Sequence, residues 1–240
     1  MKKALLLLLL SLQLFSSQAL KEIVIVSEEW KDMTNADGTG IYFDILKAIY
    51  EPLDIKVKIK IAPYNRSTLM VKNKTADVWL GSYIDEEDFA IYPKYYFDQD
   101  TITAMFKTAK FPTFNGVQTL KNRNVGWIRG YGYDEYIDIK MNILERNNRK
   151  SILLSLEKDR FDIFLDDKYD MQEAIEQAKF DTSKYSFVEL LKFKLYPAFR
   201  DDERGKKLRE IWDSRFKELL NDGSMKKLYI KHDFQEYFLY

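Results

Sequence analysis

Two stretches of the sequence place small or charged polar groups directly after a short apolar run. Val78-Trp79-Leu80 is followed by Gly81-Ser82-Tyr83, and Phe161 to Leu165 is followed by Asp166-Asp167. Each run comes after a basic helix end, which is the pattern of a helix, a tight turn and a buried strand. Ligands of open α/β sheets bind beyond the carboxyl ends of the strands, so we expect both polar ends to face one cleft.

Two arginines stand where a strand end meets an expected helix start, and either could bind an anion. Arg66 follows Tyr64, and its planar guanidinium could hold a carboxylate or phosphate through paired N–H donors. Arg129 precedes Gly130 and Tyr131 before another expected helix, whose free N–H groups favour an anion. The alternatives are a surface arginine paired with a neighbour at Arg66 and an ordinary glycine turn after Arg129.

Other candidates offer an aromatic ring, a close backbone approach and a hydroxyl. Trp30 lies in the polar loop after the first strand, where its ring would either stack on a ligand or form a lid of hydrophobic packing. Gly81 lets the backbone approach a ligand closely, and Ser82 adds a hydroxyl. The full set of candidate ligand-binding residues is Trp30, Tyr64, Arg66, Gly81, Ser82, Tyr83, Arg129, Gly130, Tyr131, Asp166 and Asp167.

Alternating strands and helices are expected between these candidates. Strands are expected at 23–26, 57–61, 101–106 and 124–128 as well as in the two opening stretches, and helices at 42–49, 65–72 (with Asn65 as a possible N-cap), 134–142, 152–158, 169–178 and 208–220. A short amphipathic segment is expected at 185–190 and a separate apolar one at 193–199. The repeated strand–helix pattern predicts two similar α/β lobes.

The first residues have the composition of an export signal. Met1-Lys2-Lys3 is basic, Ala4 to Leu10 is almost pure Leu, and Ser17-Gln18-Ala19 carries small residues typical of a cleavage site. The apolar run is too short for a stable membrane span, so a retained anchor is the less favoured alternative. We expect a signal peptide over 1–19, cleaved near Ala19, and a periplasmic protein.

Composition argues against several classes of protein and site. The chain has 38 basic and 38 acidic residues, so no general attraction to nucleic acid is expected. It has no cysteine and one histidine, His232, which excludes a His/Cys zinc site and a disulfide framework. The P-loop, GxSxG and HExxH motifs are missing. We therefore expect neither a metal nor a cofactor.

Several segments together resemble family 3 of the bacterial extracellular solute-binding proteins, the periplasmic amino-acid-binding type. Gly40 to Ile49 is similar to the family's Gly-aromatic-x-x-Asp-apolar helix start, and Lys74 to Asp77 to the step before its third strand. Arg160 to Asp167 resembles the corresponding step of the second lobe, and Leu208 to Tyr229 the terminal helix and its Asp-Gly ending. The similar segments occur in the family's order over nearly the whole mature chain.

The resemblance implies a two-lobed (type II) periplasmic binding protein fold with a double hinge crossing and an inter-lobe cleft. Lobe 1 would comprise residues 20–107 and 199–240, and lobe 2 residues 108–198. The crossings would lie near Lys107–Lys110 and Leu195–Phe199. The implied function is capture of a small polar solute, amino-acid-like or another small organic ion, by a monomer that closes on it and possibly serves an ABC-type transporter permease. Asp167 falls where the family's acidic residue binds a ligand ammonium, and only one of Asp166 and Asp167 can face the cleft.

The sequence departs from the family after Gly81-Ser82-Tyr83. Amino-acid binders usually carry an arginine about five residues further on that holds the ligand carboxylate, whereas this chain has Ile84 to Asp88 there. An acidic run would repel a carboxylate, so either Arg66 and Arg129 take that role or the ligand is cationic or of another kind. We interpret the acidic run itself as the solvated start of a helix rather than as a cation site.

Two other functions stay open. The first is an enzyme on the same scaffold, similar to the cyclohexadienyl dehydratases, in which Arg66, Arg129 and an Asp or Glu would supply an anion clamp and a general acid. The second is a sensory or partner-binding module that uses exposed aromatics among Tyr92, Tyr95, Tyr96 and Phe97. Core packing is the alternative explanation for these aromatics.

Overall fold

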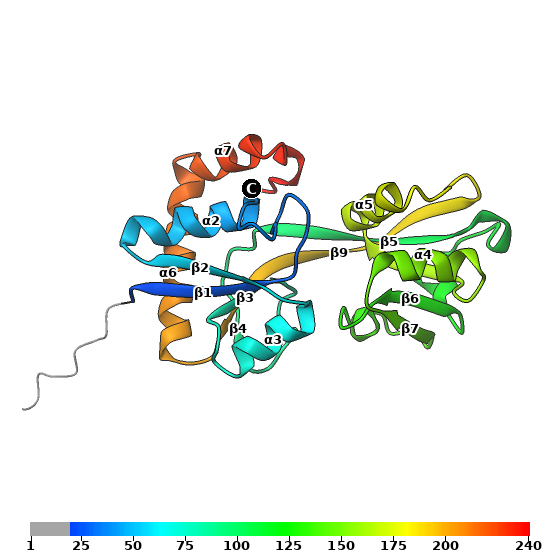
Figure 1. Ribbon diagram of the computed structural model, residues 1–240, viewed down its shortest axis with the longest axis horizontal. Helices are drawn as coiled ribbons and strands as arrows, with labels where there is room; N and C mark the ends of the chain where they lie inside the picture. The colour runs from blue at the N-terminus through cyan, green and yellow to red at the C-terminus, as the bar shows by residue number, and fades with distance from the viewer. Residues whose placement is uncertain (1–19) are drawn as a thin grey trace, which may run out of the picture.

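The computed structural model describes residues 20–240, and the expected signal peptide over 1–19 lies outside them. The strands are β1 (Glu22–Ser27), β2 (Lys56–Ile61), β3 (Val78–Ser82), β4 (Ala90–Ile91), β5 (Asp98–Lys107), β6 (Asn124–Ile128), β7 (Asn142–Arg146), β8 (Ile163–Asp167) and β9 (Tyr185–Arg200). The α-helices are α2 (Ile41–Tyr50), α3 (Tyr64–Lys72), α4 (Arg149–Glu157), α5 (Lys168–Ala178), α6 (Glu203–Asn221) and α7 (Ser224–Lys231). These elements form two lobes that β5 and β9 join (Figure 1).

One continuous sheet runs through both lobes. Its strand order is β2-β1-β3-β9-β5-β8-β6-β7, with β4 paired to β9. In lobe 1, β1 is parallel to β2 and β3, while β3 is antiparallel to the end of β9. In lobe 2, β6 is parallel to β7 and β8, while β5 is antiparallel to β8 and β9. The carboxyl ends of the parallel strands in each lobe therefore lie at one edge of that lobe's sheet.

Each lobe has helices packed on its sheet through an apolar face. In lobe 1, α6 buries Leu208, Trp212 and Phe216, which follow the helical period expected from the sequence. In lobe 2, α4 buries Ile152 and Leu156 in a separate cluster. Each lobe thus holds its strand ends on its own packed core, so the loops beyond those ends start from fixed positions.

The connection between the lobes is a two-stranded segment. Residues 98–101 of β5 pair only with residues 192–195 of β9, whereas residues 102–106 also pair with β8 of lobe 2. The chain therefore enters the sheet of lobe 2 before it reaches the crossing expected near Lys107–Lys110. The division of the chain at 107/108 and 198/199 stays a prediction.

Three local expectations differ from the structure. The helix expected at 134–142 is wrong: a single 3-10 turn, Tyr133–Glu135, is followed by irregular chain, and Asn142 already belongs to β7, which pairs with β6. Asn65 is not an N-cap, since α3 begins at Tyr64 with Pro63 in the cap position. The segments expected at 185–190 and 193–199 are one strand. In it, Pro197 lies opposite a register shift in β3, where its missing N–H is tolerated.

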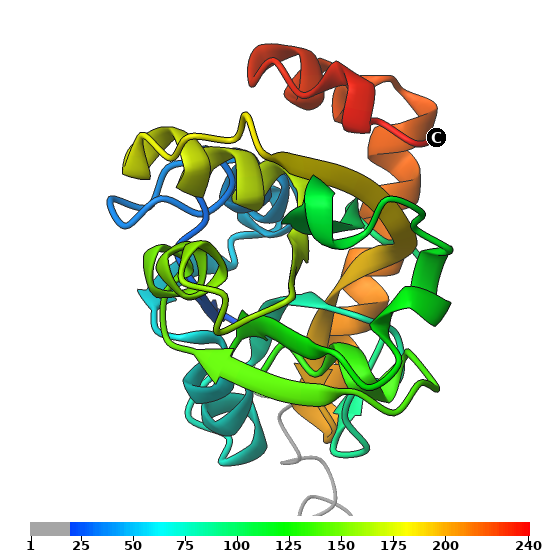
Figure 2. The same cartoon turned by 90° about the vertical axis from the view of Figure 1, so that its right-hand side faces the viewer.

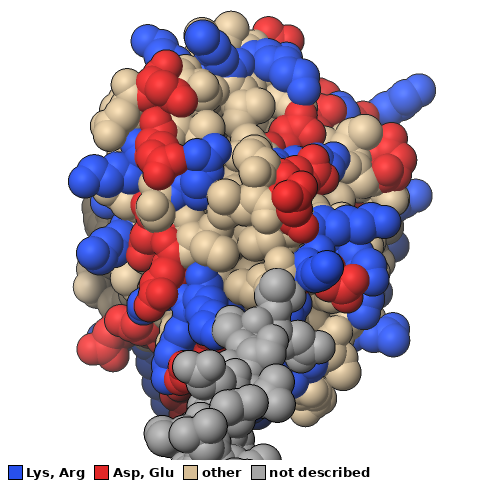
Figure 3. Space-filling view, turned by 90° about the vertical axis from the view of Figure 1, so that its left-hand side faces the viewer, with Lys and Arg blue, Asp and Glu red and all other residues tan. Residues whose placement is uncertain are grey.

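The surface at the outer end of lobe 1 carries charges of both signs. Basic and acidic side chains intermingle there (Figure 3). The edge strand β2 contributes exposed Lys56, Lys58 and Lys60, which protect an open sheet edge against pairing with another chain. Within residues 20–240, no helix combines the length and the apolar character needed to cross a membrane.

Candidate functional site

A cavity of about 670 Å³ lies between the lobes. Lobe 1 lines it with the loop after β1, and lobe 2 lines it with the start of α4 and one side of α5. Its lining residues include Glu28, Glu29, Lys31 and Asn35 from lobe 1 and Asn148, Arg149, Lys150, Glu173 and Gln177 from lobe 2. This volume falls in the range of small-molecule sites, and the lining is unusually polar and carries both signs of charge.

Direct contacts join the lobes beside this cavity. The indole N–H of Trp30 donates to the hydroxyl of Tyr131 at 3.3 Å, and the rings of Tyr64 and Tyr131 meet edge to face at 5.9 Å. The hydroxyl of Tyr169 on α5 donates to Asp32 at 3.2 Å, which places α5 beside the loop of residues 28–40 (Figure 2). The structure therefore brings together Trp30, Tyr64 and Tyr131, three of the residues proposed from the sequence.

Two glycines allow these close approaches. Gly81 has φ +82°, and a Cβ there would lie 2.6 Å from the Trp30 ring, so the ring packs directly on the end of β3. Gly130 has φ +87°, and a Cβ there would lie 1.7 Å from the Asn65 amide. A side chain at either position would be strained and would push against the opposite group. Gly130 is thus the point where the loop of lobe 2 meets α3 of lobe 1.

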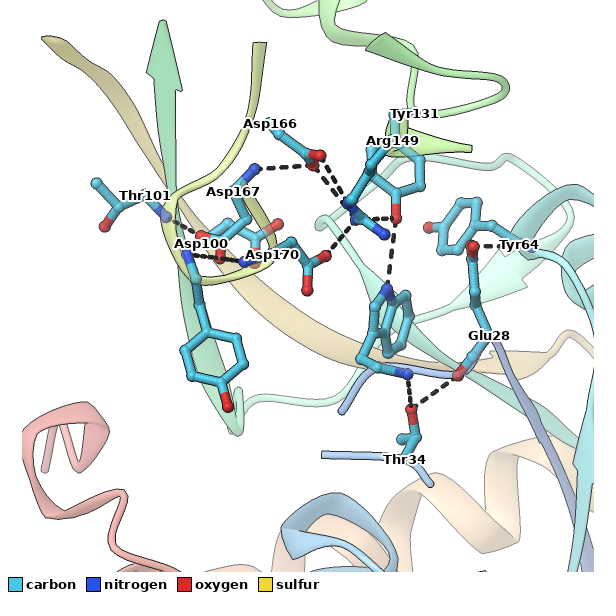
Figure 4. Close-up of polar contacts among 12 residues, drawn as sticks. Glu28, Thr34, Tyr64, Asp100, Thr101, Tyr131, Arg149, Asp166, Asp167 and Asp170 are labelled. Carbon is cyan, nitrogen blue, oxygen red and sulfur yellow. Dashed lines mark hydrogen bonds and ion pairs between the residues drawn. The ribbon is translucent and has the colours of Figure 1, made fainter. Parts of the chain in front are cut away.

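The most strongly charged group of the cleft is a cluster centred on Arg149 (Figure 4). Its Nε donates to Asp166 at 2.7 Å, its guanidinium also pairs with Asp170, and one of its N–H groups donates to the Tyr131 hydroxyl at 3.0 Å. Burial raises the pKa of Asp166 and of Asp170, and the nearby Arg149 charge offsets only part of that effect. The cluster is a buried ion-pair network that supports the Tyr131 ring and its contacts with lobe 1.

Arg149 and Asp170 were missed from the sequence. The sequence did carry a signal for Arg149. A basic residue at the first position of a helix is unfavourable beside the positive end of the helix dipole, which indicates a compensating acidic partner. Asn148 before it is an evident N-cap and accepts from Ser151 N at 2.9 Å. No such signal marks Asp170, since an acidic residue in the first turn of a helix is ordinary.

Asp166 and Asp167 point to different partners, as adjacent residues of a strand do. Asp166 is fully buried against Arg149. Asp167 caps α5: one of its oxygens accepts from Tyr169 N at 2.8 Å, and the other accepts from Thr101 N at 2.9 Å. Burial raises the pKa of Asp167, and these backbone N–H groups counter that rise. The Asp167 carboxylate that the resemblance assigned to a ligand ammonium therefore has its oxygens bound to backbone N–H groups.

The acidic run after β3 does not form the expected solvated helix start. Residues 84–89 form turns, and Asp85 takes the left-handed conformation with φ +58°. That turn directs Glu86 back to β3, where its carboxylate accepts from the Ser82 hydroxyl at 2.6 Å. The expectation is wrong because a run of acidic residues does not show which one the fold buries. Ser82 thus binds a group of its own chain.

Tyr83 and the two proposed arginines lie in different surroundings. The hydroxyl of Tyr83 donates to Asp100 at 2.8 Å, and its ring packs on Tyr136 and Phe193. Arg66 and Arg129 are both exposed and line neither the large cavity nor the smaller one beside Gly130. Within residues 20–240, neither guanidinium makes a hydrogen bond or an ion pair. Both arginines are thus exposed neighbours of the Gly130–Asn65 contact and do not line either of these two cavities.

A second inter-lobe cavity, of about 160 Å³, lies next to Glu86. It is lined by Glu86 and Glu87 of lobe 1 and by Gly130, Tyr131, Gly132, Glu135 and Tyr136 of lobe 2. Its three carboxylates face no basic side chain in the lining. In the part of the chain that the structure describes, no group of three or more acidic or histidine side chains is placed to hold a metal ion.

Comparison with known proteins finds likeness in structure and none in sequence. No protein-family model matches the chain, and no curated protein does. An ancestral arginine-binding protein bound to arginine is similar at 17% identity with a TM-score of 0.70, over 91% of this chain and 98% of that one. A mutant of ArgBP from T. maritima is similar at 16% identity with a TM-score of 0.70, over 88% and 94%.

Two further solved structures show how broad the likeness is. A substrate-binding protein of an ABC uptake transporter from Streptococcus pneumoniae, with bound histidine, is similar at 17% identity with a TM-score of 0.67, over 91% of this chain and 92% of that one. The GluR0 ligand-binding core from Nostoc punctiforme, in complex with glutamate, is similar at 12% identity with a TM-score of 0.69, over 88% and 99%. At these identities the likeness concerns the fold. The chain thus has the two-lobed fold of the periplasmic binding proteins, as the sequence predicts.

Proposed function

We propose that the protein binds a small polar organic solute between its lobes and retains it by lobe closure. The observation that carries this proposal is the cavity of about 670 Å³, whose lining comes from both lobes. A solute that contacts both lobes at once favours the closed arrangement, because its contacts with each lobe are then made together. The two-stranded connector between the lobes is the natural place for such a motion.

The same proposal extends to where the protein works and what it serves. The basic and leucine-rich start of the sequence supports export to the periplasm. Proteins of the same fold include substrate-binding proteins of ABC transporters, which supports delivery of the captured solute to a membrane permease. A monomer is enough for capture, because one chain supplies both halves of the cleft.

The alternative of an enzyme on this scaffold receives less support. It required Arg66 and Arg129 to form an anion clamp near an acid, and both side chains are exposed and outside the inter-lobe cavities. Arg149, the arginine that does reach the cleft, is paired with Asp166 and Asp170. Capture without chemistry is therefore the function that the geometry supports best.

A thermal-shift screen tests the proposal. Amino acids, polyamines, small di-acids and short peptides are added to the purified protein. A true ligand raises the melting temperature by an amount that grows with the logarithm of its concentration over Kd. Lys31→Trp places bulk at the mouth of the large cavity and should weaken the shift, whereas Lys21→Trp, an exposed residue outside the cavity, should leave it unchanged. No shift with any solute would contradict the proposal.

A further inference from the structure

The carboxylate of Glu86 is bound by its own chain in the way that a protein binds a carboxylate ligand. It accepts from the Ser82 hydroxyl at 2.6 Å, from the backbone N–H of Tyr83 at 3.1 Å and from the Tyr64 hydroxyl at 2.7 Å. Two hydroxyls and a backbone N–H that converge on one carboxylate form a set of donors for an anion. These donors lie at the carboxyl end of β3, where the fold places its ligands.

The local backbone is shaped to bring Glu86 to this position. Asp85 takes the left-handed conformation, with φ +58°, which an aspartate adopts only at some cost in energy. The turn reverses the chain within a few residues, so Glu86 folds back onto the strand that precedes it. Glu86 also lines the cavity of about 160 Å³ together with Gly130, Tyr131 and Tyr136 of lobe 2. Its carboxylate therefore stands at the interface between the lobes.

Two other anion-binding groups of the cleft are also occupied by carboxylates of the chain. The N–H of Tyr64, at the start of α3, donates to Glu28 at 3.2 Å. Arg149 is held by Asp166 and Asp170. The wall of the large cavity carries both signs of charge, with exposed Lys31 and Lys150 beside Glu28, Glu29 and Glu173 among its lining residues. A ligand carboxylate that enters beside Glu86 would thus find its donors taken and would face a like charge.

We propose that Glu86 is a built-in carboxylate that fills the anion subsite of the cleft, so the cleft takes an amine or guanidinium solute that lacks a carboxylate group. This inference rests on the proposed function, because it names the ligand class for the space between the lobes, where Glu86 lines the cavity of about 160 Å³ and not the larger one. Glu86, Glu87 and Glu135 provide acceptors for such a cation, and the rings of Tyr131 and Tyr136 provide aromatic surface beside them. Hydrogen-bond donors that are already bound to Glu86 exclude a ligand carboxylate more strongly than a cleft of altered shape would.

The test compares pairs of compounds that differ only in one carboxylate group. Agmatine and arginine, cadaverine and lysine, and histamine and histidine are titrated calorimetrically into the purified protein. We expect the wild type to bind at least one amine about 100-fold or more tighter than its parent amino acid. In Glu86→Ala, which frees the three donors, the preference should shrink by about tenfold or more toward the amino acid.

Two further variants separate the donor set from simple charge. Glu86→Gln removes the charge but keeps the shape of the side chain and an acceptor for the donors. Amino acids should therefore stay excluded from Glu86→Gln, although Glu86→Ala admits them. Glu87→Gln removes a charge from the same cavity without emptying the donors, and it too should keep amino acids excluded. A Glu86→Ala protein that does not fold leaves the wild-type pairs as the deciding measurement.

The failures of the two proposals are distinct. Binding of an amino acid by the wild type as tightly as its amine would overturn the role of Glu86 while leaving solute capture intact. Binding only of di-acids or peptides would overturn it as well. If no solute of the wider panel binds, the proposed function fails, and the inference about its ligand class fails with it.

Discussion

The indole N–H of Trp30 and the hydroxyl of Tyr131 are joined by a hydrogen bond of 3.3 Å that spans the two lobes. The same hydroxyl accepts from Arg149 at 3.0 Å, and Arg149 is fixed by Asp166. A continuous set of contacts therefore runs from the loop of lobe 1 to the buried ion pair of lobe 2. Separation of the lobes must break the Trp30–Tyr131 contact while leaving the ion pair within lobe 2 intact.

The close approach of Gly130 to Asn65 predicts a variant that impairs closure more than folding. Gly130→Ala should lose about 1 kcal/mol of stability from its left-handed backbone and should weaken solute binding about tenfold, because the new methyl group meets the Asn65 amide. Gly116→Ala is the matched control, since Gly116 has φ +56° and open space around it. Calorimetric titration and denaturant unfolding should show that both variants lose stability and only Gly130→Ala loses affinity.

Rescue by a second substitution makes this prediction sharper. Asn65→Gly removes the opposing amide, so the double variant should recover most of the affinity lost in Gly130→Ala but none of the stability. Equal affinity losses in Gly130→Ala and Gly116→Ala would show that backbone strain, and not the contact between the lobes, is responsible.

The burial of Asp166 and Asp170 predicts a large loss of stability when their arginine is removed. Arg149→Ala should lower the free energy of unfolding by about 3–5 kcal/mol, because it leaves buried carboxylates without their counter-charge. Arg129→Ala should change it by less than about 0.5 kcal/mol, since that side chain is exposed. Chemical denaturation measures both, and adding Asp166→Asn to Arg149→Ala should restore part of the loss. Equal effects of the two arginine variants would contradict the assigned network.

Asp98 predicts a pH dependence of stability with a definite sign. Asp98 lies at the start of the two-stranded connection, its buried carboxylate accepts from the Tyr42 hydroxyl, and burial raises its pKa from 3.8 to about 7. At a pH between 3.8 and about 7, the folded state therefore keeps the proton on Asp98, whereas the unfolded state has released it. Stability from this group is fully present below pH 3.8 and is lost as the pH rises through about 7.

Asp98→Asn tests this dependence directly. The variant should be more stable than the wild type at pH 8 by on the order of 4 kcal/mol at most, and the difference should shrink steadily toward pH 4. Denaturant unfolding of both proteins across that range gives the difference and cancels the contributions of other acids. A difference that does not vary with pH would show that Asp98 keeps an ordinary pKa.

The arrangement of strands and helices could largely be predicted because it follows from local periodicity. The β-branched run at 23–26 and the helical stripe of Leu208, Trp212 and Phe216 each indicate one element whatever surrounds them. The exceptions depend on partners distant in sequence. β9 is one long strand because it pairs with both lobes in turn, and Asn142, expected in a helix, belongs to β7 because it pairs with Asn124 of β6.

The charges of the cleft could not be predicted in the same way. Glu86 and its neighbour Glu87 are alike in sequence, and only the turn at Asp85 directs one of them to Ser82 and Tyr64. Arg129 and Arg149 both follow short β-strands, but one guanidinium faces solvent and the other meets two buried acids. Which charge is buried depends on tertiary contacts that no local pattern encodes.

Lobe closure on a bound solute is the central claim, and a distance between the lobes tests it most directly. The chain has no cysteine, so Leu69→Cys on α3 and Leu154→Cys on α4, residues that are 53% and 43% exposed, can carry a pair of spin labels. As a solute that raises the melting temperature is added, the distance distribution should shift to shorter values. The solute concentration that gives half of this shift should equal the midpoint of the calorimetric titration. An unchanged distribution at saturating solute would contradict capture by closure.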